Sequence, residues 1–186
     1  MVPNDISGYA HILSAQPIGT GDIAIFGVYN GKGVAEAAKR FQRTTYAFDT
    51  FEGLPSEEYM DIDSDNPPGK FVPEHNAYEW LLYQPLVKPL KGRFLHTLPL
   101  IPAETKFGYV YLDADYYKSY KQVLDYLDTH NHWGENCLII TDDYYHLPAV
   151  KQAMDEWTAK HGLQLKEGCW VRWSDRKSTR LNSSHT

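Results

Sequence analysis

This sequence has few cysteines and no cluster of basic residues, and each of these features excludes a class of protein. Only two of its 186 residues are cysteines, Cys137 and Cys169, too few and too isolated for a disulfide framework or a zinc site. We expect both to be buried thiols in strands. The formal net charge is −6 and Lys and Arg are nowhere clustered, whereas phosphate binding requires such clusters. A nucleic-acid partner is therefore not expected.

Long apolar runs are also missing. The longest fall well short of the roughly 18 residues that span a bilayer, and residues 1–20 lack the basic start and apolar stretch of a signal sequence. We therefore expect a cytoplasmic protein that does not bind membranes. We find no internal repeat, low-complexity tract or linker, and a hydrophobic content of 42% suffices for one core. The sequence predicts a single domain over residues 1–174.

The last residues differ from the rest of the chain. The string DRKSTRLNSSH, residues 175–185, has neither aromatic residues nor an apolar period. It resembles the translation of a common sequencing-adapter oligonucleotide. We expect residues 175–186 to be a non-native tail that replaces the natural C-terminus near Ser174.

Short apolar segments alternate with amphipathic ones, which is typical of an α/β protein with a largely parallel sheet. The helical spacing is clear at Val34, Ala37, Ala38 and Phe41, which recur at i, i+3, i+4, i+7. Pro85 is expected to end or kink a later helix. Strands are expected at residues 22–28, 44–51, 92–99, 107–115 and 137–143, helices at 31–43, 77–87, 120–127 and 150–157, and an antiparallel pair at 163–168 and 169–173.

Polar motifs follow the expected strands at their carboxyl ends, where ligands gather in open parallel sheets. In FGVYNGKG, Gly27, Gly31 and Gly33 form a turn whose backbone can approach a ligand closely before a helix start that favours an anion. This is not the G-x-G-x-x-G of dinucleotide binders. In FDTFEGLP, Asp49 stands where a carboxylate can accept hydrogen bonds from ribose hydroxyls. The alternatives are a tight turn for the glycines and a loop cap for Asp49.

Carboxylates follow the next two expected strands. Asp113 and Asp115 end one strand and point to the same side if it stays extended, and Asp142 and Asp143 end the next. Carboxylates gathered at one sheet edge repel each other unless a cation or protons neutralise them. All-oxygen ligation suits Mg2+ best and Mn2+ second. The alternative is that these residues are solvated and begin the following helices.

The segment DIDSDNPPGKFV, residues 61–72, imitates the start of a calcium-binding loop. Its sixth position is Asn66 instead of Gly and its twelfth is Val72 instead of Glu, so calcium binding is not expected. We expect a solvated loop, at an edge of the sheet where long loops often act as lids.

Taken together and in this order, FGVYNGKG, FDTFEGLP, LDADYY and IITDDYY resemble the macrocin-type (TylF-like) sugar O-methyltransferase family of class I S-adenosylmethionine-dependent methyltransferases. The likeness covers roughly Gly21 to Trp173. It implies a Rossmann-like fold, a mostly parallel twisted sheet with helices on both faces and an antiparallel C-terminal strand. It also implies S-adenosylmethionine and Mg2+ as cofactors and a small-molecule hydroxyl acceptor, a sugar, as partner. Homo-oligomerisation is left open.

The resemblance also implies roles for individual residues. Gly27 and Gly31 lie against the methionine part of the cofactor, and Asp49 holds its ribose. Asp115 matches the general base. The metal ligands are matched by Asp113, Asp142 and Asp143, and the expected cofactor-binding set is Gly27, Val28, Tyr29, Gly31, Gly33, Asp49, Thr50 and Asp113.

Three hypotheses about function remain open. The first is Mg2+-dependent transfer of a methyl group from S-adenosylmethionine to a hydroxyl of a sugar or glycosylated natural product. The second takes the sequence from Asp113 to Asp115 as the metal-nucleotide motif of a glycosyltransferase. The third is a cofactor-binding homologue without turnover, indicated by Ile25, where the family carries Glu, and by the short segment before the first strand.

Overall fold

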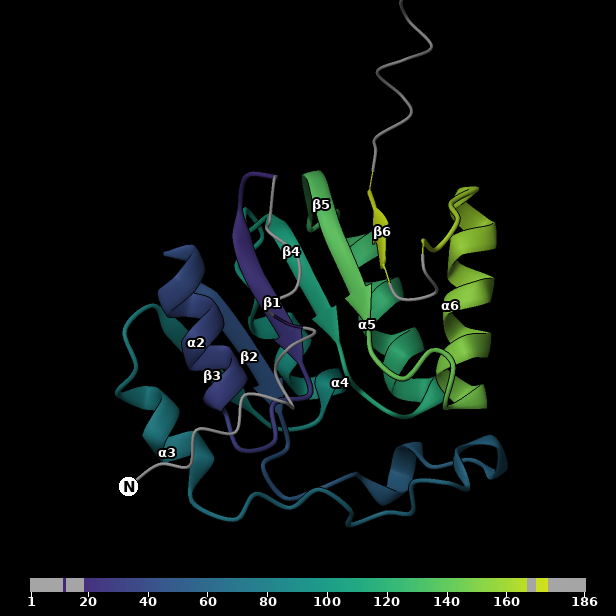
Figure 1. Ribbon diagram of the computed structural model, residues 1–186, viewed down its shortest axis with the longest axis horizontal. Helices are drawn as coiled ribbons and strands as arrows, with labels where there is room; N and C mark the ends of the chain where they lie inside the picture. The colour runs from purple at the N-terminus through teal and green to yellow at the C-terminus, as the bar shows by residue number, and fades with distance from the viewer. Residues whose placement is uncertain (1–11, 13–18, 167–169, 174–186) are drawn as a thin grey trace, which may run out of the picture.

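The computed structural model describes residues 12, 19–166 and 170–173, which form a six-stranded sheet between helices (Figure 1). The strands are β1 (Asp22–Phe26), β2 (Thr45–Asp49), β3 (Val87–Lys91), β4 (Phe107–Leu112), β5 (Trp133–Thr141) and β6 (Trp170–Arg172). The helices are α2 (Lys32–Phe41), α3 (Ala77–Leu82), α4 (Phe94–Thr97), α5 (Tyr117–Thr129) and α6 (Pro148–His161), with short 3-10 turns η2 (Ser56–Glu58), η3 (Asp61–Asp63) and η4 (Leu98–Leu100). Cys169 and the expected tail at 175–186 lie outside the described residues.

The strand order is β3-β2-β1-β4-β5-β6. Strands β1 to β5 pair in parallel, so the prediction of an α/β protein with a largely parallel sheet is confirmed. β6 runs antiparallel to β5, with Val171 opposite Ile139; the sequence had suggested residues 163–168 as its partner. The strand order changes direction between β1 and β4, because β2 and β3 are added on one side of β1 and the later strands on the other. Such a switch point is where open α/β sheets bind ligands.

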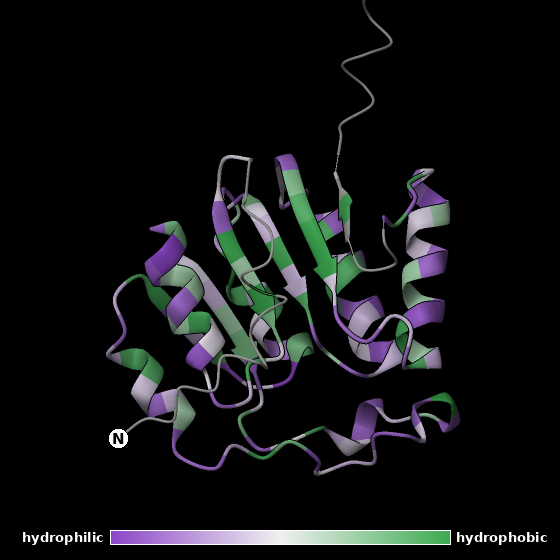
Figure 2. Ribbon diagram, in the orientation of Figure 1, coloured by the Kyte–Doolittle hydropathy of each residue, from purple (hydrophilic) through white to green (hydrophobic). Residues whose placement is uncertain are grey.

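Two apolar layers cover the sheet, which explains why the central strands are apolar throughout. Along β4, Val110 and Leu112 face the layer built with α4, α5 and α6, whereas Tyr109 and Tyr111 face the layer built with α2 and α3. A strand that is buried on both faces has no polar alternation. Figure 2 shows the hydrophobic colour concentrated along β1 and β5.

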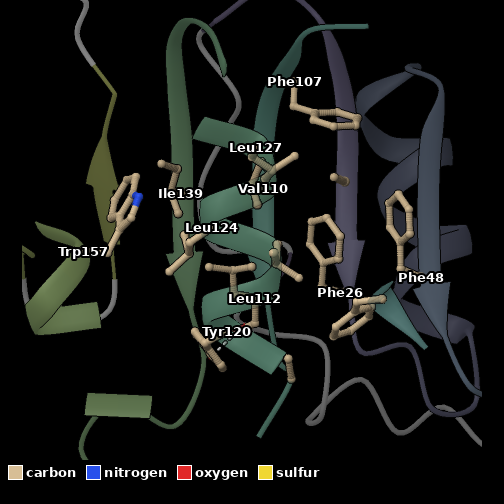
Figure 3. Close-up of a cluster of buried hydrophobic side chains, with 14 of the residues drawn as sticks. Phe26, Phe48, Phe107, Val110, Leu112, Tyr120, Leu124, Leu127, Ile139 and Trp157 are labelled. Atoms are coloured by element: carbon tan, nitrogen blue, oxygen red, sulfur yellow. Dashed lines mark hydrogen bonds between the residues drawn. The ribbon is translucent and has the colours of Figure 1, made fainter. Parts of the chain in front are cut away.

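The layer built with α4, α5 and α6 is the larger of the two (Figure 3). Its buried residues confirm the helical spacing that the sequence predicted for α5 and α6. The rings of Phe26 and Phe48 stack within it with centroids 4.5 Å apart, and Cys137 is buried in it as expected. The buried residues of the two helices are Tyr120, Val123, Leu124, Leu127, Val150, Ala153, Met154 and Trp157.

The other helices also follow the sequence. α2 buries Val34, Ala37 and Ala38, while Phe41 packs at the margin of the core. α3 ends before Pro85, as predicted. In the part of the chain that the structure describes, no helix is both long enough and apolar enough to cross a bilayer.

The expected strand at residues 92–99 is wrong. Residues 94–97 form α4 instead, because Phe94 and Leu98, one helical turn apart, both pack into the larger apolar layer. The strand β3 precedes this helix and lies at the edge of the sheet. Pro89 is tolerated there, since an edge strand can lack a ladder donor.

Asp128 ties α5 to β5 and α6. Its carboxylate accepts hydrogen bonds from Trp133 Nε1 (2.9 Å), Lys160 Nζ (3.0 Å) and His161 Nε2 (2.8 Å), and a further one from Trp157 Nε1. Burial raises the pKa of Asp128, but the donors from Lys160, Trp133 and His161 lower it by more. The net pKa lies below its ordinary value, so the fold favours the charged carboxylate.

We expect Asp128→Asn to lower the free energy of unfolding near neutral pH by about 1.5–3 kcal/mol, the range for hydrogen bonds to charged groups. Because the folded pKa is depressed, this stabilisation is present above the unfolded-state pKa of about 3.9 and is lost as the pH falls through the folded pKa. Urea unfolding at neutral and at acid pH measures both effects. The control is Asp125→Asn, an exposed carboxylate 3.8 Å from Lys121, with an expected cost below about 0.5 kcal/mol. An equal loss of unfolding free energy in the two variants would contradict the stabilising role of the Asp128 carboxylate.

Candidate functional site

The site lies at the carboxyl ends of β2, β1, β4 and β5, which are neighbours in this order. The backbone ladder continues one residue beyond three of these strands. The amides of Gly27, Asp113 and Asp142 each donate to a carbonyl of the neighbouring strand, at 3.0, 2.8 and 2.8 Å respectively. Residues that are far apart in sequence are thereby fixed side by side at one edge.

A cavity of about 380 Å³ opens at this edge, within the size range of small-molecule sites. Gly31 and Gly33, which were expected in the cofactor site, do not line it: Gly31 caps α2 and faces Leu81, and Gly33 is buried in the first turn of α2. These two glycines therefore shape the start of α2, next to the residues that line the cavity. The expected residues that do line the cavity are Gly27, Val28, Tyr29, Asp49, Thr50, Asp113, Asp115, Asp142 and Asp143.

Gly27 is required by a close approach of two strand ends. Its φ is +89°, and a Cβ at this position would lie 1.7 Å from the carbonyl oxygen of Asp113. Only a residue without a side chain fits both the conformation and the space. The turn after β1 therefore packs directly against the residue that follows β4.

Asp49 holds the same turn from the other side. Its Oδ2 accepts hydrogen bonds from the amides of Val28 (2.6 Å) and Tyr29 (3.0 Å), and its Oδ1 accepts one from the amide of Phe51 (2.8 Å). The structure thus has the loop cap that was one of the two alternatives for this residue. Asp49 also lines the cavity, so a ligand in the cavity would lie against the capped turn.

Asp113, Asp142 and Asp143 form a cluster of carboxylates. One oxygen from each lies within 4.8 Å of the other two. Burial raises the pKa of Asp113 well above its ordinary value, and the charges of Asp142, Asp115, Asp143 and Asp49 raise it further. These carboxylates cannot all be charged at low cost without a cation, and an all-oxygen donor set is the one that Mg2+ prefers. The donor set therefore fits a divalent cation.

Asp115 lines the cavity, but its orientation does not come from the strand alternation that the sequence predicted. β4 ends at Leu112, so strand alternation does not apply to Asp113 and Asp115. Instead, the backbone of Asp115 turns into the left-handed region, with φ of 55°. Non-glycine residues in this region cluster at functional sites. Burial raises the pKa of Asp115 to about 7, and Asp143 adds to the shift, while Lys70 and Asn66 oppose it.

Most residues of the loop 61–72 are exposed, as expected for a solvated loop, but two of its polar side chains are buried. Figure 1 shows the segment between β2 and α3 passing beneath the carboxyl ends of the strands. Asp63 and Asn66 are buried in it, at 4% and 7% exposure. The side chain of Asn66 donates a hydrogen bond to Asp115, so the loop closes onto the site.

Sequence reasoning missed Glu58, Arg93 and Ser119, which also line the cavity. Glu58 is buried, and its carboxylate accepts hydrogen bonds from Arg93 Nε (3.2 Å) and Ser119 Oγ (2.9 Å). Correct assignment of β3 would have placed Arg93 at the carboxyl end of a strand. The burial of Glu58 had no local signal.

Comparison with protein-family models matches residues 20–168 to Macrocin-O-methyltransferase (TylF). The chain belongs to this family. The resemblance identified from the four sequence motifs is therefore confirmed.

Individual relatives of known name agree with the family. The chain is 26% identical over 162 residues to a Mycinamicin III 3''-O-methyltransferase of Micromonospora griseorubida, covering 77% of this chain and 62% of that protein. It is 29% identical over 160 residues to a Demethyldecarbamoylnovobiocin O-methyltransferase of Streptomyces niveus, covering 77% and 60%. The chain thus spans about three fifths of the length of these relatives.

Among solved structures, the O-methyltransferase NovP is similar to this chain. The TM-score is 0.62 at 25% sequence identity, and the match covers 89% of this chain and 75% of NovP. The fold of the described residues is therefore that of an O-methyltransferase.

Proposed function

We propose that this chain transfers a methyl group from S-adenosylmethionine to a hydroxyl of a sugar or glycosylated natural product, and that Mg2+ is required. The observation that carries the proposal is the convergence of Asp113, Asp142 and Asp143 on one cavity with the Gly27 turn. Two relatives of the family carry names of natural-product O-methyltransferases.

The residues present fit both groups. Gly27 lines the cavity with its backbone alone, and Asp49 holds the turn that carries it in place. The three clustered carboxylates offer the oxygen donors that Mg2+ prefers. When bound, S-adenosylmethionine supplies the methyl group, and Mg2+ makes a neighbouring hydroxyl more acidic.

Asp115 has the role of general base in this proposal. It lines the cavity beside the carboxylates that would hold the metal. Its own carboxylate would take the proton that the acceptor hydroxyl loses when the methyl group passes from the sulfur of S-adenosylmethionine to the hydroxyl oxygen and S-adenosylhomocysteine is released. The buried setting of Asp115 suits this task, because a base removed from water holds a proton more firmly than an exposed carboxylate.

The other two hypotheses are less well supported. The family match does not favour a glycosyltransferase. A homologue without turnover remains an outcome of the test: Ile25 is fully buried in the apolar layer beside α2, so it offers no polar group in place of the Glu of the family.

The proposal is tested by screening a library of hydroxyl compounds for release of S-adenosylhomocysteine. We expect glycosides to be methylated, a chelator to abolish release and added Mg2+ to restore it. Full turnover in excess chelator would contradict the metal dependence. Binding of S-adenosylhomocysteine without turnover of any acceptor would favour the inactive homologue.

We expect Asp142→Asn and Asp143→Asn to lose affinity for the metal, because an amide oxygen is a neutral and weaker ligand. Mn2+ binding followed by electron paramagnetic resonance measures this loss without an acceptor. The control is Asp61→Asn, an exposed carboxylate outside the cluster, which should bind Mn2+ as the wild type does. Unchanged affinity in both cluster variants would remove them from the site.

We expect Asp49→Ala to weaken S-adenosylhomocysteine binding several-fold or more, because the turn after β1 loses the acceptor of its Val28 and Tyr29 amides. Calorimetry gives the affinity. The control is Glu52→Ala, which removes an exposed carboxylate paired with Lys91 at 2.9 Å and should leave the affinity unchanged. Equal affinity in wild type and Asp49→Ala would exclude Asp49 from the cofactor site.

A further inference from the structure

A buried amide connects a cation to the proposed base. Asn66 Nδ2 donates to Asp115 Oδ1 at 2.5 Å, and Asn66 Oδ1 accepts from Lys70 Nζ at 2.6 Å. The three side chains come from two segments that are separate in sequence, with Asn66 and Asp115 49 residues apart. Sequence reasoning assigned no role to Asn66 or Lys70.

The chemistry of the partners fixes the orientation of the Asn66 amide. A lysine ammonium can only donate and an ionised carboxylate can only accept. The amide oxygen must therefore face Lys70, and the amide nitrogen must face Asp115. The hydrogen bond from Lys70 involves an ionised group, and so does the bond to Asp115 when its carboxylate is charged, which makes both stronger than bonds between neutral partners.

The loop that carries Asn66 is held at both sides of this residue. The Asp63 carboxylate accepts hydrogen bonds from the amide of Tyr117, the first residue of α5 (3.0 Å), and from the amide of Met60 within the loop segment (2.8 Å). Further along, Lys70 and Leu54 are joined through their backbones, with Leu54 N–H donating to the Lys70 carbonyl at 2.9 Å. The position of Asn66 is thus set by the loop and not by the hydrogen bond to Asp115 alone.

We propose that Asn66 is a positioning residue for the Asp115 carboxylate, and that Lys70 orients Asn66. The inference rests on the proposed function, in which Asp115 is the base. The bond to Oδ1 fixes the plane of the carboxylate, and with it the direction in which Oδ2 meets the acceptor. A base held in one orientation loses less freedom in the transition state than a rotating one.

The competing explanation is that Asn66 only anchors the loop. The two explanations differ in what they predict for Lys70. An anchor tolerates any Lys70 variant that leaves the loop folded, whereas orientation of the amide requires a donor at this position. Lys70→Arg keeps a charged donor and Lys70→Met removes it at similar length.

The test measures kcat, acceptor KM and melting temperature on a glycoside that the wild-type protein methylates. We expect Asn66→Ala and Asn66→Asp to lower kcat by about 10–100-fold, with acceptor KM and S-adenosylhomocysteine affinity within about twofold of wild type. Lys70→Met should lower kcat, whereas Lys70→Arg should keep kcat close to the wild-type value. The control is Asp65→Asn, an exposed neighbour in the same loop, which should match the wild type in all three quantities.

A second measurement needs no acceptor. The Asn66 side-chain amide is followed by 15N–1H correlation and assigned by its loss in Asn66→Ala. We expect its resonance to shift in Asp115→Ala and to stay in place in Asp65→Asn; an unshifted resonance would overturn the inference. So would a kcat of the Asn66 variants equal to that of Asp65→Asn. A wild-type protein that methylates no acceptor would instead overturn the proposed function, and the inference with it.

Discussion

Asp115→Asn should lower turnover by about a hundredfold to ten-thousandfold, the usual loss when a general base is removed. The substitution keeps the size and shape of the side chain, and its amide oxygen still accepts the hydrogen bond from Asn66. The loop and the cavity should therefore stay intact. Calorimetry of S-adenosylhomocysteine and Mn2+ binding should give affinities within about threefold of wild type.

Asp113→Asn provides the contrast. This residue belongs to the carboxylate cluster with Asp142 and Asp143, so its replacement should weaken the metal, and part of the lost activity should return at high Mg2+. Rates of both variants across a Mg2+ titration separate the two roles. Rescue of Asp115→Asn by the metal would mean that the roles are reversed, and an unchanged rate in both would exclude both from the reaction.

Gly27→Ala should destabilise the fold by about 3 kcal/mol or more, because it adds a methyl group both to a strained backbone and to an occupied space. The new Cβ would meet the Asp113 carbonyl oxygen at 1.7 Å. The ends of β1 and β4 would have to separate, and Asp113 would leave the carboxylate cluster. Thermal unfolding and S-adenosylhomocysteine binding should both be impaired.

Gly69→Ala is the matched control. Gly69 has a φ of +79°, close to that of Gly27, but nothing lies within 4 Å of the position its Cβ would take. This variant should show only the backbone cost of about 1–2 kcal/mol for a left-handed residue. If both variants unfold alike, the contact with Asp113 contributes nothing and the close approach of the two strand ends is not critical.

The sequence predicted the residues that gather at the site more reliably than their geometry. Asp49 ends one strand, Asp113 and Asp142 each follow another directly, and the carboxyl ends of parallel strands meet at one edge of the sheet. This inference needs only local information: an apolar run, its end and the residue type that comes next. It failed at residues 92–99, where the residues of α4 were mistaken for a strand, and it missed β3 just before them.

By itself, the sequence determined the α/β class, the helical faces and the carboxylates of the candidate site, because periodicity and strand ends are local properties of the chain. The family followed from the resemblance of four motifs in their order. Only the tertiary structure decided which glycines line the cavity, how Asp115 turns toward it, and that Asn66 and Glu58 are buried beside it. Glu58 meets Ser119 across 61 residues, and Asn66 reaches Asp115 from a loop without periodic pattern. Such contacts depend on the path of a loop, which is set by hydrogen bonds and packing with distant segments and leaves no regular signal in the sequence.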